Sequence, residues 1–199
     1  SSDLAIRLWT LDDEVVIASI KSKMHTISAE VTAGLAKGLE IAESGYKGMV
    51  IWTQDGPFSA GADLQSMMPA FMAGGGKAIA PFEKQLQDFM LSLRYSNVPT
   101  VAAMHGLALG GGCELAVHAA KRVAAMETYV GLVEVGVGLI PGGGGLAYLA
   151  RRAAEQVEAS KGVSGMVGAE LMGFVKEGFQ AAAMAKVATS AIEAKKFGY

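Results

Sequence analysis

One stretch of the sequence, residues 101–145, restricts the fold more than any other. It begins with an apolar, β-like run, Val101–Met104, and passes through three consecutive glycines, 110–112, into a helical pattern that begins near Cys113. A strand, a glycine turn and a helix in this order bring bare backbone N–H groups and the positive end of a helix dipole towards a ligand. The stretch therefore predicts a site that uses main-chain donors to bind a negatively charged group.

A carboxylate, Glu114, falls within the first turn of this predicted helix. On a protein surface, such a residue only stabilises the start of the helix, by ~0.3–1 kcal/mol. In a pocket lined by glycine and alanine, the same side chain would be a catalytic acid or base. The residues alone leave both interpretations open, and Glu134, taken alone, is more typical of a solvated surface charge.

Three well-known glycine motifs do not fit this sequence. A Walker loop requires Gly-Lys-Ser/Thr, which follows neither glycine cluster. A dinucleotide fingerprint nearly fits at residues 136–138, but Pro141 stands where its third glycine belongs. A serine-hydrolase elbow nearly fits around Ser59, but Pro57 replaces its first glycine. The glycines therefore indicate a site that uses backbone donors rather than one for a nucleotide pyrophosphate.

Composition narrows the class of protein. The chain has 199 residues, of which 51% are hydrophobic, so we expect one globular domain, residues 1–199, with a substantial core. A net charge of −2 gives no electrostatic reason to expect nucleic acid, and no apolar run is long enough to span a bilayer. The single cysteine, Cys113, excludes an internal disulfide and favours a reducing, cytoplasmic location. No histidine–carboxylate cluster has metal-ligand spacing, so we expect no metal.

Alternating β-like and helical segments predict an α/β fold. Residues 5–9 and 15–20 are expected to form a hairpin, and Ser28 to begin a helix that ends near Gly45. The continuous apolar run Met49–Thr53 is typical of a buried parallel strand. The remaining expectations are a mobile segment at 67–76, helices at 82–93, 146–158, 171–179 and 181–195, and a glycine-broken segment at 160–168.

Three blocks together resemble the crotonase superfamily, and enoyl-CoA hydratases most closely. They are Phe58–Leu64 (FSAGADL), Ala108–Leu115 (ALGGGCEL) and Glu134–Gly143 (EVGVGLIPGG), in the order and at the separation typical of that family. The resemblance implies a crotonase-type ββα spiral, with two roughly perpendicular sheets flanked by helices. It is strong over residues 4–146 and weaker over the helical segment 147–199, which we expect to be truncated.

The resemblance also implies roles for single residues. Ala62 and Gly111 match the two oxyanion-hole donors of the family, and Glu114 and Glu134 match the two catalytic glutamates of its hydratases. Their separation in sequence, 134 − 114 = 20, fits that subgroup. Like-charge proximity would leave one glutamate ionised and the other protonated. We assign Glu114 as the base towards water and Glu134 as the proton donor, although the reverse assignment is open.

Coenzyme A contacts follow from the same resemblance. Ala60, Ala62 and Asp63 in the first block match positions that bind coenzyme A, and Lys23 matches a contact from an earlier loop. In that loop, residues 25–27 read His-Thr-Ile where hydratases usually show Asn-Ala-Leu. No tightly bound cofactor is implied, because the substrate is carried as a coenzyme A thioester.

Three functions stay open at this point. The first is hydration of trans-2-enoyl-CoA in fatty-acid β-oxidation by the two glutamates and the oxyanion hole. The second is Δ3,Δ2-enoyl-CoA isomerisation, which needs one glutamate to move a proton. The third is an inactive acyl-CoA-binding module. Residues 183–199 also resemble the crotonase part of bifunctional hydratase/3-hydroxyacyl-CoA dehydrogenases, so a fused dehydrogenase is expected, as is a homo-oligomer (trimer or dimer of trimers).

Other reactive side chains receive structural interpretations. No histidine has the spacing of a partner for Cys113, which is therefore expected to be a small buried residue. His105 and His118 are expected to be packed or hydrogen-bonded. A methionine group, Met67, Met68 and Met72, suits either an acyl-chain tunnel or a mobile cover loop.

Overall fold

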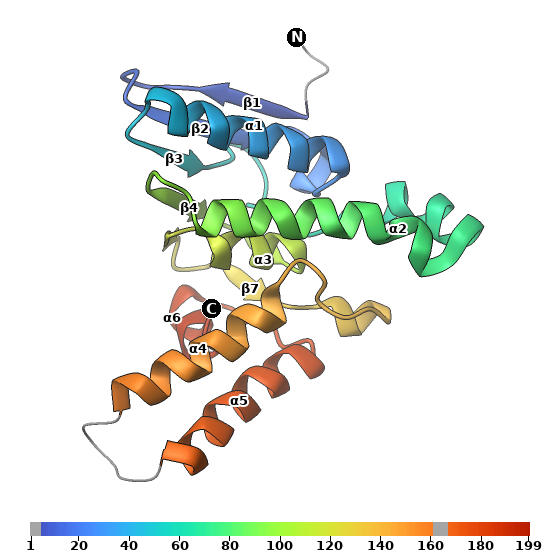
Figure 1. Ribbon diagram of the computed structural model, residues 1–199, viewed down its shortest axis with the longest axis vertical. Helices are drawn as coiled ribbons and strands as arrows, with labels where there is room; N and C mark the ends of the chain where they lie inside the picture. Colours follow the sequence, from blue (N-terminus) through green and yellow to red (C-terminus); the bar gives the residue numbers. More distant parts are fainter. Residues whose placement is uncertain (1–4, 161–166) are drawn as a thin grey trace.

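The computed structural model describes residues 5–160 and 167–199 (Figure 1), so position 4 of the predicted core and residues 161–166 of the predicted glycine-broken segment lie outside it. Its elements follow one another from the N-terminus at one end to two long helices at the other. In order, they are β1 (Ile6–Trp9), β2 (Val15–Ile20), η1 (Lys23–His25), α1 (Ala29–Gly45), β3 (Gly48–Ile51), α2 (Leu64–Arg94), β4 (Thr100–Met104), β5 (Leu107–Leu109), α3 (Gly111–His118), β6 (Lys121–Ala124), β7 (Tyr129–Gly131), η2 (Glu134–Val137), α4 (Gly145–Ser160), α5 (Val167–Ala183) and α6 (Ala191–Lys196).

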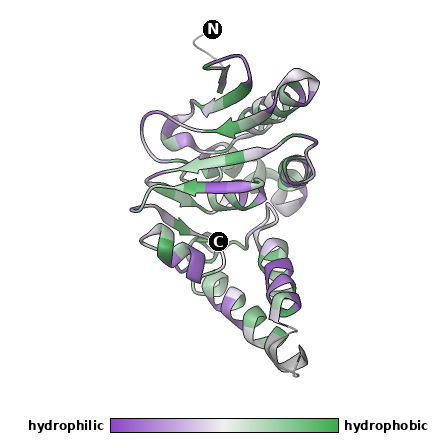
Figure 2. Cartoon of the chain, turned by 90° about the vertical axis from the view of Figure 1, so that its left-hand side faces the viewer, coloured by the Kyte–Doolittle hydropathy of each residue, from purple (hydrophilic) through white to green (hydrophobic). Residues whose placement is uncertain are grey.

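The described strands form two sheets. The larger has the order β1-β2-β3-β4-β6, in which only the β1-β2 pair is antiparallel, and β5 and β7 form a second, parallel pair. Figure 2 shows these strands stacked side by side, with helices beside them and a helical extension below. This arrangement confirms the predicted hairpin, the predicted parallel strand and the mixed α/β class with sheets flanked by helices.

Helix α1 illustrates how the sequence produces this packing. The Ser28 hydroxyl accepts a hydrogen bond from the Val31 N–H at 3.3 Å, which satisfies one of the free donors at the helix start. Leu35 and Leu39 on the same face are buried in the core. A Cβ on Gly34 would lie 2.6 Å from Cγ1 of Ile6, so glycine at this position allows the helix to pack closely on β1. The predicted helix is confirmed.

The segment 67–76, predicted to be mobile, is helical in the structure. These residues belong to helix α2, whose start is capped by the Asp63 carboxylate, which accepts from the Ser66 N–H at 3.3 Å. Glycines weaken a helix but do not exclude it, and the helical geometry breaks only at Gly75, with φ of 60° and ψ of −151°. The long helix therefore reaches from the first motif block to the core.

The predicted helix over residues 181–195 is wrong. Helix α5 ends at Ala183, and Ala188 then pairs with Val130 in an isolated antiparallel bridge before α6 begins. The Ser190 hydroxyl caps α6 by accepting from the Glu193 N–H at 3.2 Å. The spacing Ser-x-x-Glu is the start signal of a helix, so it argued for two helices rather than one. None of the described helices is long and apolar enough to cross a membrane.

Candidate active site

Helix α3 and the loop after β3 meet at the centre of the molecule. Every residue of α3 is buried, and the glycine before it, Gly110, has φ of 51°, which a residue with a side chain rarely adopts. A Cβ on Gly111 would lie only 3.3 Å from the backbone N of Ala62. Within the described residues, neither the Ala62 N–H nor the Gly111 N–H has a hydrogen-bond acceptor. The structure thus brings together two free main-chain donors that lie 49 positions apart in sequence (111 − 62 = 49).

Glu114 is fixed in place by the loop that precedes α4. The residue is 2% exposed, and its Oε1 accepts a hydrogen bond from the Gly145 N–H at 2.9 Å. A Cβ on Gly143 would lie 2.6 Å from Oε2, so this loop can approach the carboxyl group only because it is built from glycine. Burial raises the pKa of Glu114 to about 7, and the nearby Glu134 carboxylate acts in the same direction. Near neutral pH this group is therefore able both to accept and to release a proton.

Glu134 reaches the same place from η2, a short 3-10 helix after β7. Its Oε1 lies beside Gly110, where an added Cβ would be 3.2 Å away. Its Oε2 is buried and has no hydrogen-bond partner among the described residues. Burial raises the pKa of Glu134 as well. A buried oxygen without a protein partner is typical of a group that meets a substrate or water there.

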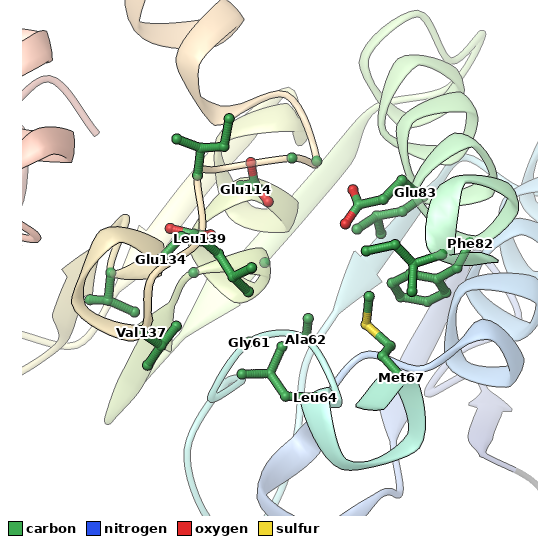
Figure 3. Close-up of a pocket in the computed structure, with 18 of the residues that line it drawn as sticks. Gly61, Ala62, Leu64, Met67, Phe82, Glu83, Glu114, Glu134, Val137 and Leu139 are labelled. Atoms are coloured by element: carbon green, nitrogen blue, oxygen red, sulfur yellow. The ribbon is translucent and has the colours of Figure 1, made fainter. Parts of the chain in front are cut away.

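One cavity of about 720 Å³ connects these groups, and they all line it. Figure 3 shows Glu114 and Glu134 at one side, with Ala62 at another. The wall is mainly apolar and is formed by segments from four parts of the chain. The lining residues are Ala60, Gly61, Ala62, Leu64, Met67, Ile79, Phe82, Glu83, Leu86, Gly110, Gly111, Glu114, Val133, Glu134, Val135, Val137, Gly138, Leu139, Ile140, Gly142 and Gly143.

The cavity contains a third carboxyl group that sequence reasoning missed. Glu83 of α2 faces Glu114 and Glu134 across the space (Figure 3), and burial raises its pKa. A signal was present, because Glu83 lies next to Phe82 and three positions before Leu86 on the predicted apolar face of a helix. A charge on such a face is unusual enough to mark a functional residue.

The predicted coenzyme A contacts are only partly brought together. Ala60 lies on the cavity wall with Ala62, whereas Asp63 and Lys23 do not line it. Asp63 caps α2, and Lys23 lies exposed in η1, whose Met24 carbonyl accepts from the Ala60 N–H at 3.1 Å. Asp63 and Lys23 are therefore close in sequence or by a backbone hydrogen bond to lining residues, but do not line the cavity themselves.

The other reactive side chains behave as predicted. Cys113 is fully buried, and burial raises the pKa of its thiol, which disfavours a nucleophilic thiolate. The imidazoles of His105 and His118 are hydrogen-bonded to the backbone carbonyls of Thr53 and Glu114, at 2.9 and 2.7 Å.

The three methionines lie on helix α2, and only one of them lines the cavity. Met67 lines the cavity, whereas Met68 and Met72 are 51% and 77% exposed on α2. In the described residues, no three His, Cys, Asp or Glu side chains are placed to hold a metal ion.

This combination of a two-donor site and paired carboxyl groups can be compared with known proteins. A sequence profile described as enoyl-CoA hydratase/isomerase matches residues 14–193. The chain belongs to the enoyl-CoA hydratase/isomerase family. The profile covers every described strand except β1 and most of the C-terminal helices, so membership does not depend on the three motif blocks alone.

Relatives within this family agree with that assignment. The chain is 37% identical over 189 residues to a probable 3-hydroxyacyl-CoA dehydrogenase of Bacillus subtilis, a match that covers 95% of this chain and 23% of that protein. It is 39% identical over 136 residues to a putative fatty acid oxidation complex trifunctional enzyme of Rickettsia felis, covering 68% of this chain and 19% of the other. The chain thus spans less than a quarter of the length of either relative.

Solved structures confirm the crotonase-type fold. An enoyl-CoA hydratase from Polaromonas sp. JS666 superposes with a TM-score of 0.78 at 22% identity, covering 97% of this chain and 68% of that one.

Proposed function

We propose that this chain adds water to trans-2-enoyl-CoA thioesters. A single observation supports this most strongly: two carboxyl groups, Glu114 and Glu134, line one apolar cavity together with two free backbone donors, Ala62 and Gly111. Family membership and relatives named for fatty acid oxidation support the same reaction. An isomerase needs only one carboxyl group, so the second buried one favours hydration.

The proposed chemistry uses each group once. The thioester oxygen accepts hydrogen bonds from the two N–H groups, which stabilise the negative charge that develops there; a single such donor is worth ~10²–10³ in rate. The oxygen of water forms a bond to the β-carbon while one of its protons passes to Glu114. Glu134 gives a proton to the α-carbon as the double bond is lost. One water molecule is thereby added, and a proton transfer from Glu114 to Glu134 restores the starting state.

The environments of the two glutamates support these roles. The hydrogen bond from the Gly145 N–H favours the ionised form of Glu114, which a base requires. Glu134 offers a buried oxygen with no partner among the described residues, which suits a protonated carboxyl group that donates to the substrate. This assignment agrees with the roles expected from the sequence.

The rest of the substrate fits the remaining surfaces. We assign the acyl chain to the apolar side chains that line the cavity, among them Met67, Phe82 and Leu139. The adenosine part of coenzyme A would then extend past Ala60 towards Lys23. No tightly bound cofactor is required by this chemistry.

The reaction also suggests a partner. Hydration yields a 3-hydroxyacyl thioester, which is the substrate of a 3-hydroxyacyl-CoA dehydrogenase. Because the Bacillus relative is named as such a dehydrogenase and is far longer than this chain, we propose that the two activities share one polypeptide. The mass of the natural polypeptide tests this directly. From the family resemblance we further propose a homo-oligomer, a trimer or dimer of trimers, which sedimentation analysis would test; from the single cysteine we propose a cytoplasmic location.

Activity on crotonyl-CoA tests the proposal. The wild-type chain is expected to remove the absorbance of the conjugated thioester, and Glu114→Gln and Glu134→Gln to do so far more slowly. Full activity in both variants would exclude the roles given to them. Coenzyme A binding without any turnover would instead favour a non-catalytic binding module.

A further inference from the structure

The third carboxyl group of the cavity, Glu83, has no role in the proposed hydration. It lies on α2, between Phe82 and the buried Leu86, and is half-buried on the cavity wall. Figure 3 shows its carboxylate directed into the space from the side opposite Glu134. Its position therefore places a charge where the acyl chain of a substrate would lie.

Contacts on the glycine loop place Glu83 close to the reaction centre. A side chain at Gly142 would collide with Oε2 of Glu83, and one at the next residue, Gly143, would lie 2.6 Å from Oε2 of Glu114. The Gln87 side chain, one turn further along α2, donates to the Gly142 carbonyl at 2.7 Å and holds this loop against the helix. Two consecutive glycines of one loop thus lie against the two carboxyl groups.

The charge of Glu83 is not neutralised by its surroundings. No Lys, Arg or His is found among the described residues that line the cavity, and within the described chain the Glu83 carboxylate forms no ion pair or hydrogen bond. Its charge also acts on Glu114 and Glu134, raising the pKa of both. Three acidic groups in one apolar cavity create a negative potential that weakly polar walls do not screen.

We propose that Glu83 is a specificity-determining residue, which excludes acyl-CoA thioesters that carry a second carboxylate on the acyl chain and so selects neutral chains. This inference rests on the proposed function, since it assumes that the cavity binds the acyl group of a thioester. A carboxylate entering the cavity would lose its hydration and would find acidic groups but no cationic side chain among the described lining residues. A neutral chain of the same length finds the apolar side chains of the same wall.

Binding of unreactive saturated thioesters tests the inference without relying on turnover. Two pairs of equal chain length suffice: valeryl-CoA against glutaryl-CoA, and hexanoyl-CoA against adipyl-CoA, measured by calorimetry at pH 8. The wild type is expected to bind the neutral member roughly tenfold more tightly. Glu83→Gln, which keeps the shape of the side chain, is expected to reduce this ratio to roughly twofold or threefold.

A matched control lies on the same helix. Asp88→Asn also removes one negative charge, but Asp88 is exposed, is paired with Lys84 and lies outside the cavity. Asp88→Asn is expected to keep the wild-type binding ratio. If the ratio depended on the net charge of the protein or on a general structural disturbance of α2, Asp88→Asn would change it as well.

The outcomes separate this inference from the proposed function. Equal binding within each pair by the wild type, or an unchanged ratio in Glu83→Gln, overturns the role of Glu83 and leaves the hydratase proposal standing. A changed ratio without any hydration of crotonyl-CoA supports the role of Glu83 and overturns hydration. Failure to bind any of the four thioesters overturns both.

Discussion

The two central glutamates occupy the same cavity but are held in opposite ways. Glu114 belongs to a fully buried helix, and its carboxyl group is fixed by the Gly145 N–H. Glu134 begins a four-residue 3-10 helix whose following residues are exposed, among them Val135 at 40% and Val137 at 61%. One carboxyl group is thus anchored in the core, whereas the other is carried by a surface turn.

This difference explains how one fold can give two identical side chains two tasks. A base that orients water benefits from a fixed position, because misplacement by about 1 Å can cost ~10² in rate. A proton donor to carbon needs a free oxygen that faces the substrate, and Oε2 of Glu134 has no partner in the described structure. Environment, rather than residue type, therefore separates the acid from the base.

The largest expected effect comes from removing each glutamate and measuring two reactions. Glu114→Gln should lower kcat for hydration by ~10²–10⁴ but leave much of any isomerisation of a 3-enoyl-CoA, which needs one proton carrier. Glu134→Gln should lower both rates by a similar factor. Steady-state kinetics with crotonyl-CoA and a 3-enoyl-CoA check this. Equal loss of both reactions in the two variants would remove the distinction between the glutamates.

A smaller effect is expected from disturbing only the anchor of Glu114. Gly143→Ala places a Cβ 2.6 Å from Oε2 of Glu114 and must displace the carboxyl group. We expect kcat for hydration to fall by roughly 10–100-fold, because the base is retained but misplaced. Gly45→Ala is the matched control, since an added Cβ there meets nothing within 4 Å. Equal kinetics of the two variants would contradict the importance of the anchor.

The smallest expected effect concerns stability. The pKa of Glu114 is raised from 4.5 to about 7 in the folded chain, so the folded state binds the proton more tightly than the unfolded state. This contribution to stability is fully present below pH 4.5 and is lost as the pH rises through about 7. Glutamine at this position cannot ionise, so Glu114→Gln avoids this loss. Between pH 4 and pH 8, the free energy of unfolding of Glu114→Gln should therefore rise by about 1–3 kcal/mol relative to that of the wild type.

Urea unfolding of the wild type and Glu114→Gln at both pH values measures this prediction. If the two proteins differ in stability by the same amount at pH 4 and pH 8, ionisation of the buried Glu114 does not destabilise the folded state.

The sequence predicted the parts of the site that depend on local backbone geometry. Ala62 and Gly111 were identifiable as donors through the family resemblance, because they match the oxyanion-hole positions of the first two motif blocks. The two glutamates were identifiable from their separation of 20 residues and the glycines around them, through the family resemblance. Their closeness in space, which the sequence could only imply, is shown by the cavity that both line.

The parts that were missed depend on packing between distant segments. Glu83 joins the site because α2 packs against the glycine loop before α4, where a Cβ on Gly142 would meet its carboxylate. That helix survives because its start is capped by Asp63 and its far half is buried through Leu86 and Leu93. Tertiary contacts thus outweighed local helix propensity, and the packing of α2 also places Glu83 in the cavity.

Titration of the Glu114 carboxyl group tests the central claim most directly. The side-chain carboxyl carbon, observed by NMR as the pH is raised, should change its chemical shift with a midpoint of about 7 in the wild type. In Glu134→Gln the midpoint should fall, because the Glu134 carboxylate, when ionised in the substrate-free protein, raises the pKa of Glu114. A midpoint near 4.5 in the wild type, or one that does not move in the variant, would show that the two carboxyl groups do not share a buried site.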